Sequence, residues 1–199
     1  MIAPIDPYKI AKKKPYPWKI IMHNYTFSVT RNSDDDFVYF PFSFDARINL
    51  SAREVWEEWK TTHRDHDICW LWPLKFSQPT VEPWPPAEGG LQTLAYQIPN
   101  PHDPNKPKKN ATYQFHILEW DDKTMTYAYR ATDDHPFLTG GGKLVITSFN
   151  DDSCRFLWQG EYKHIAGDAG KEAQGDVFAF FLGQFFTTMA QNIKQKAEY

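Results

Sequence analysis

The chain has 199 residues, a formal net charge of −3 and an aromatic content of 17%, including eight Trp. Its length suits one domain with a sizeable core, and its slight acidity offers no basic surface for nucleic acid. No apolar run approaches the roughly 18 residues that a membrane-spanning helix needs, so no stable membrane insertion is expected. Two distant cysteines make no disulfide framework and the N-terminus lacks a signal-peptide pattern, which favours a cytoplasmic protein.

The N-terminal region predicts an arm followed by a hairpin. Residues 1–17 interleave Pro with Lys, which indicates an extended arm, and residues 18–199 are expected to form a single domain. Two stretches rich in aromatic and β-branched residues, 18–30 and 37–50, flank the polar segment 31–36. This pattern is typical of two antiparallel strands joined by a turn.

A short helix is predicted next. Ser51 and Glu54 have the spacing of a capping box, in which each residue bonds to the backbone amide of the other. Trp56 and Trp59 recur at helical spacing and give the helix an apolar stripe, which fades as residues 61–67 turn polar.

The end of this helix, residues 63–67, reads His-Arg-Asp-His-Asp and contains two residue types that bind metals. No partner elsewhere in the chain completes a ligand set, and a solvated helix end explains the pattern. We therefore expect no metal site. No Gly-rich phosphate loop and no Gly-x-Ser-x-Gly motif occur, so no cofactor is expected either.

Six strands are predicted over the middle of the chain, because runs of aromatic and β-branched residues alternate there with turn signals. The predicted strands are 74–81, 91–98, 112–120, 125–132, 143–149 and 154–164. The segments between several of them are short enough for hairpin turns, which predicts an antiparallel meander.

The last predicted strand alternates an aromatic face with a mostly polar one, so one side of the sheet is dry. A helix predicted over residues 174–196 must cover that side with its apolar stripe. The stripe consists of Phe178, Phe181, Phe185, Met189 and Ile193. Phe180 and Phe186 lie off this stripe and offer apolar surface to the added hairpin or to a second copy, so a homodimer is one expectation.

This order of elements resembles the START-like or SRPBCC superfamily, which includes the birch-pollen-allergen and polyketide-cyclase families. Residues 50–56 look like the passage from the first strand into the first helix, residues 118–121 like the end of the fourth core strand, and residues 155–162 like the last strand. The resemblance covers residues 37–196. It implies an α+β helix-grip fold, a curved antiparallel β-sheet wrapped around a long C-terminal α-helix, with an extra N-terminal hairpin strand added before residue 37.

The resemblance also implies a cavity between sheet and helix that takes a hydrophobic small molecule. Alternation along strands and helix then gives the candidate ligand-binding residues, which are Tyr127, Phe156, Trp158, Tyr162, His164, Phe178, Phe181 and Phe185. Rings at such spacings more often form plain core, because a pattern reports burial and not empty space.

His135 is the leading candidate acid or base, because imidazole exchanges protons near neutral pH and Asp134 would orient it. In the family their loop lies at the pocket mouth, and the glycines at 140–142 would let it move. Tyr129 would donate a hydrogen bond to a substrate oxygen. A solvated turn and a satisfied core tyrosine are the alternatives, and the face of His116 is left open.

Two classes of function follow. The first is a cofactor-independent enzyme resembling polyketide cyclases and dehydratases, which predicts polar groups converging inside the cavity. The second is a non-catalytic carrier for a lipid, terpenoid or aromatic metabolite, which predicts a lining that is almost wholly apolar. A partner-binding domain with a filled cavity is a third interpretation.

Overall fold

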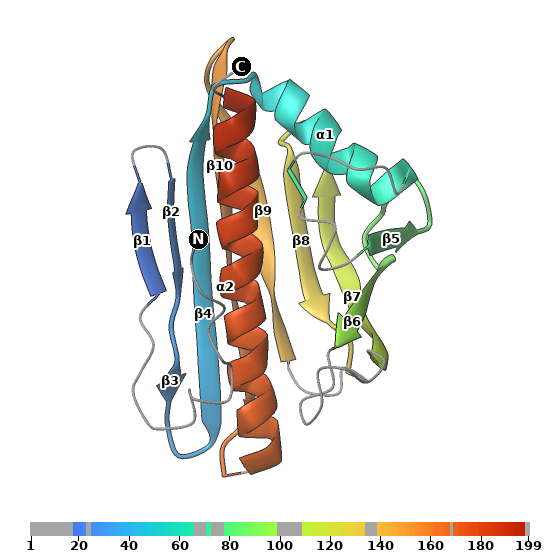
Figure 1. The fold of residues 1–199 in the computed structure, drawn as a ribbon. Helices are drawn as coiled ribbons and strands as arrows, with labels where there is room; N and C mark the ends of the chain where they lie inside the picture. Colours follow the sequence, from blue (N-terminus) through green and yellow to red (C-terminus); the bar gives the residue numbers. More distant parts are fainter. Residues whose placement is uncertain are drawn as a thin grey trace.

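The computed structural model describes residues 18–22, 25–65, 71–72, 78–98, 109–133, 139–167 and 169–197. The strands are β1 (Trp18–Met22), β2 (Tyr25–Val29), β3 (Asn32–Ser33), β4 (Phe37–Ile48), β5 (Gln78–Glu82), β6 (Leu91–Ile98), β7 (Lys109–Asp121), β8 (Thr126–Ala131), β9 (Thr139–Asn150) and β10 (Ser153–Ile165). The helices are α1 (Ala52–Asp65) and α2 (Ala169–Ala197). Figure 1 shows α2 lying along the strands and α1 crossing one end of the sheet.

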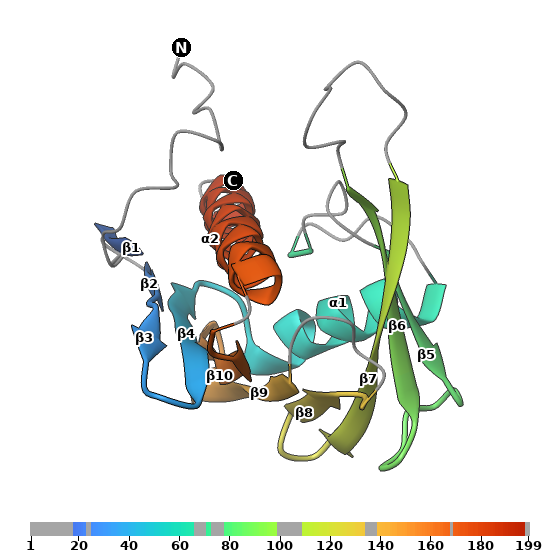
Figure 2. The same cartoon turned by 90° about the horizontal axis from the view of Figure 1, so that it is seen from below.

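All the strands belong to one sheet, in the order β1-β2-β4-β10-β9-β8-β7-β6-β5, with β3 beside β4. From β5 to β10 each strand pairs antiparallel with its neighbour in sequence, which confirms the predicted meander. Figure 2 shows the sheet curving so that both helices lie on its concave side. The helix-grip fold is therefore confirmed.

The N-terminal addition contains three strands, β1, β2 and the two-residue β3, where the sequence pattern predicted one. β1 and β2 form an antiparallel pair, and β2 extends the sheet by pairing with β4. The turn into β4 is closed by Asp34, whose carboxylate accepts hydrogen bonds from the backbone amides of Asp36 and Phe37 at 2.9 and 2.7 Å.

Alternate residues of the long strands build the concave face. On β10 the even-numbered side chains of the predicted aromatic face are buried, and β4 in register beside it adds Phe40, Phe42 and Phe44. The outer face is polar and carries the bidentate pair of Arg155 and Asp45, which joins β10 to β4. The predicted dry and wet sides of the sheet are therefore confirmed.

Gly140, Gly141 and Gly142 lie inside β9 and pair with β10, so these glycines belong to a strand. The predicted movement of the loop 133–137 stays a prediction, because residues 134–137 lie outside the described ranges. A Cβ on Gly141 would collide with the backbone of Tyr129, and a Cβ on Gly140, whose φ is +109°, would collide with that of Glu161. The missing side chains therefore let β8, β9 and β10 approach closely.

A β-bulge decides which residues of β7 face the interior. The register of β7 against β8 shifts at Leu118, which is the extra residue. Because side chains alternate, this shift places Trp120 on the concave face and turns Glu119 outward. There the Glu119 carboxylate meets Nζ of Lys143 at 2.7 Å.

The predicted capping box begins α1. The amide of Ser51 donates to Glu54 at 3.0 Å, and the amide of Glu54 donates to Oγ of Ser51 at 3.2 Å. Trp56 and Trp59 are fully buried, and the indole N–H of Trp56 donates to Asp122 at 2.6 Å. This bond ties α1 to the turn between β7 and β8.

α2 lies against β2, β4 and β10. Phe185, Met189 and Ile193 of its predicted stripe are buried. Phe186, which lies off that stripe, is also fully buried and packs on Phe27 of the added hairpin at 6.2 Å between ring centroids. No helix within the described ranges is both long enough and apolar enough to span a membrane.

Candidate ligand-binding site

Two buried phenols meet on the concave face. The hydroxyl oxygens of Tyr129 on β8 and Tyr162 on β10 are 3.0 Å apart. β9 runs between these strands, but the residues opposite the two tyrosines are Gly142 and Gly140. The two phenols therefore reach each other across a part of β9 that has no side chains on this face.

The pKa of Tyr129 is raised well above its usual value by burial, and neighbouring donors, Tyr162 and Trp158, offset only part of that rise. The indole N–H of Trp158 is directed at Tyr129, although it reaches hydrogen-bond geometry with no acceptor in the described structure. Tyr129 therefore stays a neutral phenol at physiological pH and acts as a hydrogen-bonding group rather than an anion.

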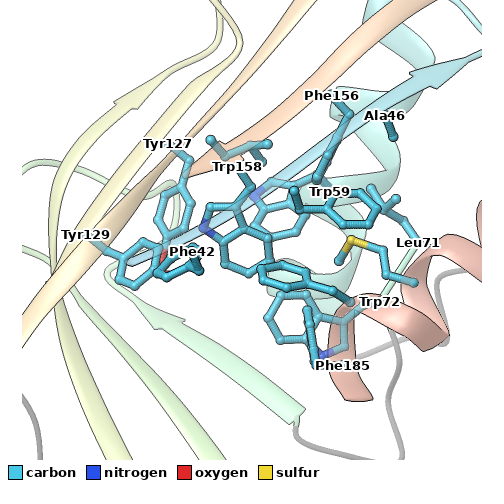
Figure 3. Packing of buried hydrophobic residues seen from close by; sticks show 14 of the residues in the cluster. Phe42, Ala46, Trp59, Leu71, Trp72, Tyr127, Tyr129, Phe156, Trp158 and Phe185 are labelled. Carbon is cyan, nitrogen blue, oxygen red and sulfur yellow. The ribbon is translucent and has the colours of Figure 1, made fainter. Parts of the chain in front are cut away.

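Tyr129 also belongs to a closed cluster of four aromatic rings, shown in Figure 3. Tyr127 stacks on Tyr129 with ring centroids 5.2 Å apart, and Trp59 meets Trp158 edge to face at 5.4 Å. Trp59 also contacts Tyr127 at 5.9 Å, and Trp158 contacts Tyr129 at 6.2 Å. Phenols from β8 are thus held against indoles from α1 and β10.

This cluster contains unpaired donors. Nε1 of Trp59 and Nε1 of Trp158 are buried and have no hydrogen-bond partner among the described residues. An unpaired buried N–H costs about 1–3 kcal/mol, so an acceptor oxygen placed here would be stabilising.

Aromatic residues of α2 supply an apolar wall. The ring of Phe178 lies 4.9 Å from that of Tyr162. The ring of Phe185 lies 5.8 Å from that of Trp158 and 4.9 Å from that of Trp72. Phe178 is partly exposed, so this side of the phenol pair is less tightly enclosed than the side under α1.

Two other predicted lining residues differ in burial. Phe156 is fully buried against Trp59, at 6.0 Å between centroids, on the side of α1. Phe181 is partly exposed on α2. His116 lies on the outer face of β7 opposite the exposed Arg130, which settles the face that the sequence left open.

His164 lies near the other end of β10, away from Trp158. Its ring is 5.6 Å from that of Phe40, and Gly175 of α2 leaves the space that the ring fills. Its Nδ1 lies 3.0 Å from the carbonyl oxygen of Ile165. The structure therefore brings together Tyr129, Trp158 and Tyr162, and His164 follows Tyr162 by two residues on the same buried face of β10.

Sequence reasoning missed a polar chain that crosses the interior beside this cluster. The hydroxyl of Tyr127 donates to Oε1 of Gln92 at 2.5 Å, and Nε2 of Gln92 lies 2.9 Å from Nε2 of His63. Nδ1 of His63 lies 2.7 Å from the backbone oxygen of Trp59. All four side chains are almost completely buried, and burial raises the pKa of Tyr127 well above its usual value.

His63 is 1% exposed, so its interpretation as part of a solvated helix end is wrong. Because residues 63–67 are all polar, the sequence did not indicate that α1 turns His63 toward the sheet. Gln92 alternates with Leu94 on β6, and the structure buries both side chains. In the ranges that the structure describes, no group of three or more His, Cys, Asp or Glu could hold a metal ion.

The two leading acid and base candidates, His135 and Asp134, lie outside the described residues. Their roles stay predictions.

A family model described as "Polyketide cyclase / dehydrase and lipid transport" matches residues 41–198. The chain belongs to this family. The match confirms the resemblance to the SRPBCC superfamily, and it leaves the added hairpin before β4 outside the family region. No curated protein matches the chain.

Solved structures share the fold of this family member at low sequence identity. The Zhui aromatase/cyclase from Streptomyces sp. R1128 has a TM-score of 0.57 and 15% identity, covering 80% of this chain and 94% of that one. Norcoclaurine synthase from Thalictrum flavum, in complex with dopamine and hydroxybenzaldehyde, has a TM-score of 0.53 and 13% identity, covering 80% and 86%. Ara h 8.0201 has a TM-score of 0.50 and 17% identity, covering 79% and 99%.

Proposed function

We propose that the protein binds a hydrophobic small molecule between the concave face of the sheet and α2, and acts on it as a cofactor-independent cyclase or dehydratase. The observation that carries the proposal is the buried phenol pair of Tyr129 and Tyr162, set in an aromatic face with unpaired indole donors. Membership in a family of polyketide cyclases, dehydrases and lipid-transport proteins supports the same class of ligand.

The chemistry needs a donor at one oxygen. In an aldol-type ring closure, the electron pair of an enol carbon forms the new C–C bond, and the carbonyl π pair moves onto oxygen. A fixed donor stabilises the charge that develops on that oxygen. Tyr129 suits this role because its hydroxyl is held by Tyr162 on the concave face and is protonated at neutral pH. Loss of water from the resulting alcohol then completes a dehydration, and the whole sequence is redox neutral.

A proton acceptor is needed at the carbon that becomes the nucleophile. His135 is our candidate for this role, with Asp134 orienting its ring. Phe178, Phe185 and Trp158 would hold the substrate folded so that the reacting carbons meet.

The test is ring closure of a synthetic poly-β-ketone thioester, followed by product chromatography. We expect Tyr129→Phe to lower the rate by about 100-fold, the effect of removing one donor to a developing oxyanion, while affinity changes only a few-fold. Tyr39→Phe is the matched control, because the Tyr39 hydroxyl bonds to Asp34 at the exposed turn before β4. Equal rates for wild type and Tyr129→Phe would contradict the catalytic part of the proposal.

A carrier is the second candidate, favoured by the apolar wall that α2 presents to the sheet. Transfer of a fluorescent fatty acid between lipid vesicles would measure it. Transfer without any cyclised product would favour the carrier, and product without transfer would favour the enzyme.

A further inference from the structure

The hydrogen bonds from His63 to Tyr127 run in one direction. A backbone carbonyl can only accept, so Nδ1 of His63 carries the hydrogen that is donated to Trp59. Nε2 of the neutral ring is then an acceptor, which the amide N–H of Gln92 fills. Oε1 of Gln92 in turn accepts from the Tyr127 hydroxyl. With His63 neutral, the Tyr127 hydroxyl therefore donates its hydrogen to Gln92. Toward a ligand in the interior, its oxygen can then act only as an acceptor.

Adding one proton from solvent to Nε2 of His63 reverses the chain. The new N–H must donate, so the amide of Gln92 turns over and accepts from His63 through Oε1. The Gln92 amide nitrogen then donates to the oxygen of Tyr127. No covalent bond of the protein changes apart from the N–H that forms, and the hydroxyl hydrogen of Tyr127 becomes free to donate elsewhere.

Burial disfavours a charged His63 ring, and its aromatic and helix-end surroundings offset part of that cost. The indoles of Trp59, Trp72 and Trp120 lie 4.7, 5.6 and 5.7 Å from its centroid. Aromatic faces attract cations, most strongly when water is excluded. His63 also lies near the C-terminal end of α1 (Ala52–Asp65), where the helix dipole favours positive charge.

The groups that face His63 come from several elements. The uncharged amide of Gln92 reaches it from β6, and the titratable phenol of Tyr127 contacts it from β8 at 5.9 Å between ring centroids. On α1 itself, Lys60 is ion-paired with Glu57 and with Asp122 of the β7–β8 turn. Within the described part of the chain, the reversal uses the hydrogen bonds that Gln92 and Tyr127 make.

We infer that His63 and Gln92 are positioning residues that set whether Tyr127 accepts or donates a hydrogen bond, and thereby select ligands by the chemistry of their oxygen atoms. The inference rests on the proposed binding function. With His63 neutral the chain favours a ligand hydroxyl, and with His63 protonated it favours a carbonyl oxygen beside the stacked rings of Tyr127 and Tyr129. By linkage, a carbonyl ligand bound there favours protonation of His63.

The test compares 9-fluorenone with fluorene, which share a ring skeleton and differ by a carbonyl group against a methylene. Displacement of a bound naphthalenesulfonate dye gives both affinities at pH 5.5 and pH 8. We expect fluorenone to bind about 5- to 10-fold more tightly at the lower pH, the worth of one hydrogen bond, and fluorene to bind equally at both. His63→Phe and Tyr127→Phe should each remove this difference, and the outer-face control His116→Phe should keep it.

Two binding results overturn the inference. One is a fluorenone affinity that does not depend on pH in the wild type, and the other is a pH dependence that survives in His63→Phe.

If neither compound binds at any pH, the proposed binding function fails, and NMR of the histidine rings still decides the inference. His63 must show the Nδ1–H tautomer at pH 8 and titrate as the pH falls to 5. Gln92→Leu must suppress that titration, since it removes the acceptor for the new N–H, whereas a ring that stays neutral in the wild type overturns the inference.

Discussion

Tyr129 and Tyr162 share a hydrogen bond of 3.0 Å although a whole strand lies between them. The bond depends on Gly142 of β9. A Cβ on Gly142 would lie 2.9 Å from the Tyr129 hydroxyl and 3.0 Å from the ring of Phe42. The two phenols can therefore meet only because residue 142 is a glycine and has no side chain.

Gly142→Ala should separate the two phenols. The added methyl group displaces Tyr129 or Phe42, and overpacking of this kind costs about 1–3 kcal/mol of unfolding free energy. Affinity for 9-fluorenone should fall together with stability, because the Tyr129 ring moves. Urea denaturation and dye displacement measure the two effects, and a variant with wild-type stability and affinity would contradict this account of the glycine.

Two glycines of α2 should respond in opposite ways to the same substitution. A Cβ on Gly183 meets nothing within 4 Å, so Gly183→Ala should stabilise the fold by about 1 kcal/mol through helix propensity. A Cβ on Gly175 would lie 2.5 Å from the His164 ring and 2.9 Å from Phe40. Gly175→Ala should therefore lower the melting temperature, and the pair serve as each other's control in thermal unfolding. A stabilised Gly175→Ala would show that α2 does not press on His164.

Cys154 should be unreactive in the folded protein. It is fully buried, and burial, with a smaller contribution from Glu54, raises the pKa of its thiol from 9.0 to about 11. Iodoacetamide at pH 8 should modify it only in denaturant.

Because the pKa of the Cys154 thiol is higher in the folded than in the unfolded state, the thiol stabilises the fold fully below pH 9.0, and this contribution is lost as the pH rises toward about 11. Cys154→Ala should make stability less dependent on pH in that window, and an unchanged profile would argue against the shift.

The sequence predicted those features that depend on local pattern. Alternation over residues 154–164 predicted the buried face of β10, and the spacing of Ser51 and Glu54 predicted the start of α1. The glycines at 140–142 were misjudged, because glycine is typical of loops and only the contacts of β9 with its two neighbours show why a strand needs them here.

The candidate site was predicted in part. Tyr129, Trp158 and Tyr162 follow from strand alternation, and the structure brings them together. His63 and Gln92 were missed because each is a single polar residue, and its burial depends on a partner far away in the sequence. Trp120 faces the interior only through the bulge at Leu118, which shifts the alternation by one residue.

The central claim is that an apolar molecule binds between the sheet and α2, and the most direct measurement is tryptophan fluorescence during titration with 9-fluorenone. We predict saturable one-to-one quenching that Phe178→Ala weakens by about 10-fold, as expected for loss of a buried ring contact. Phe149→Ala should leave it unchanged, because Phe149 is 56% exposed on the outer face. Quenching that never saturates, or that both variants weaken equally, would contradict the claim.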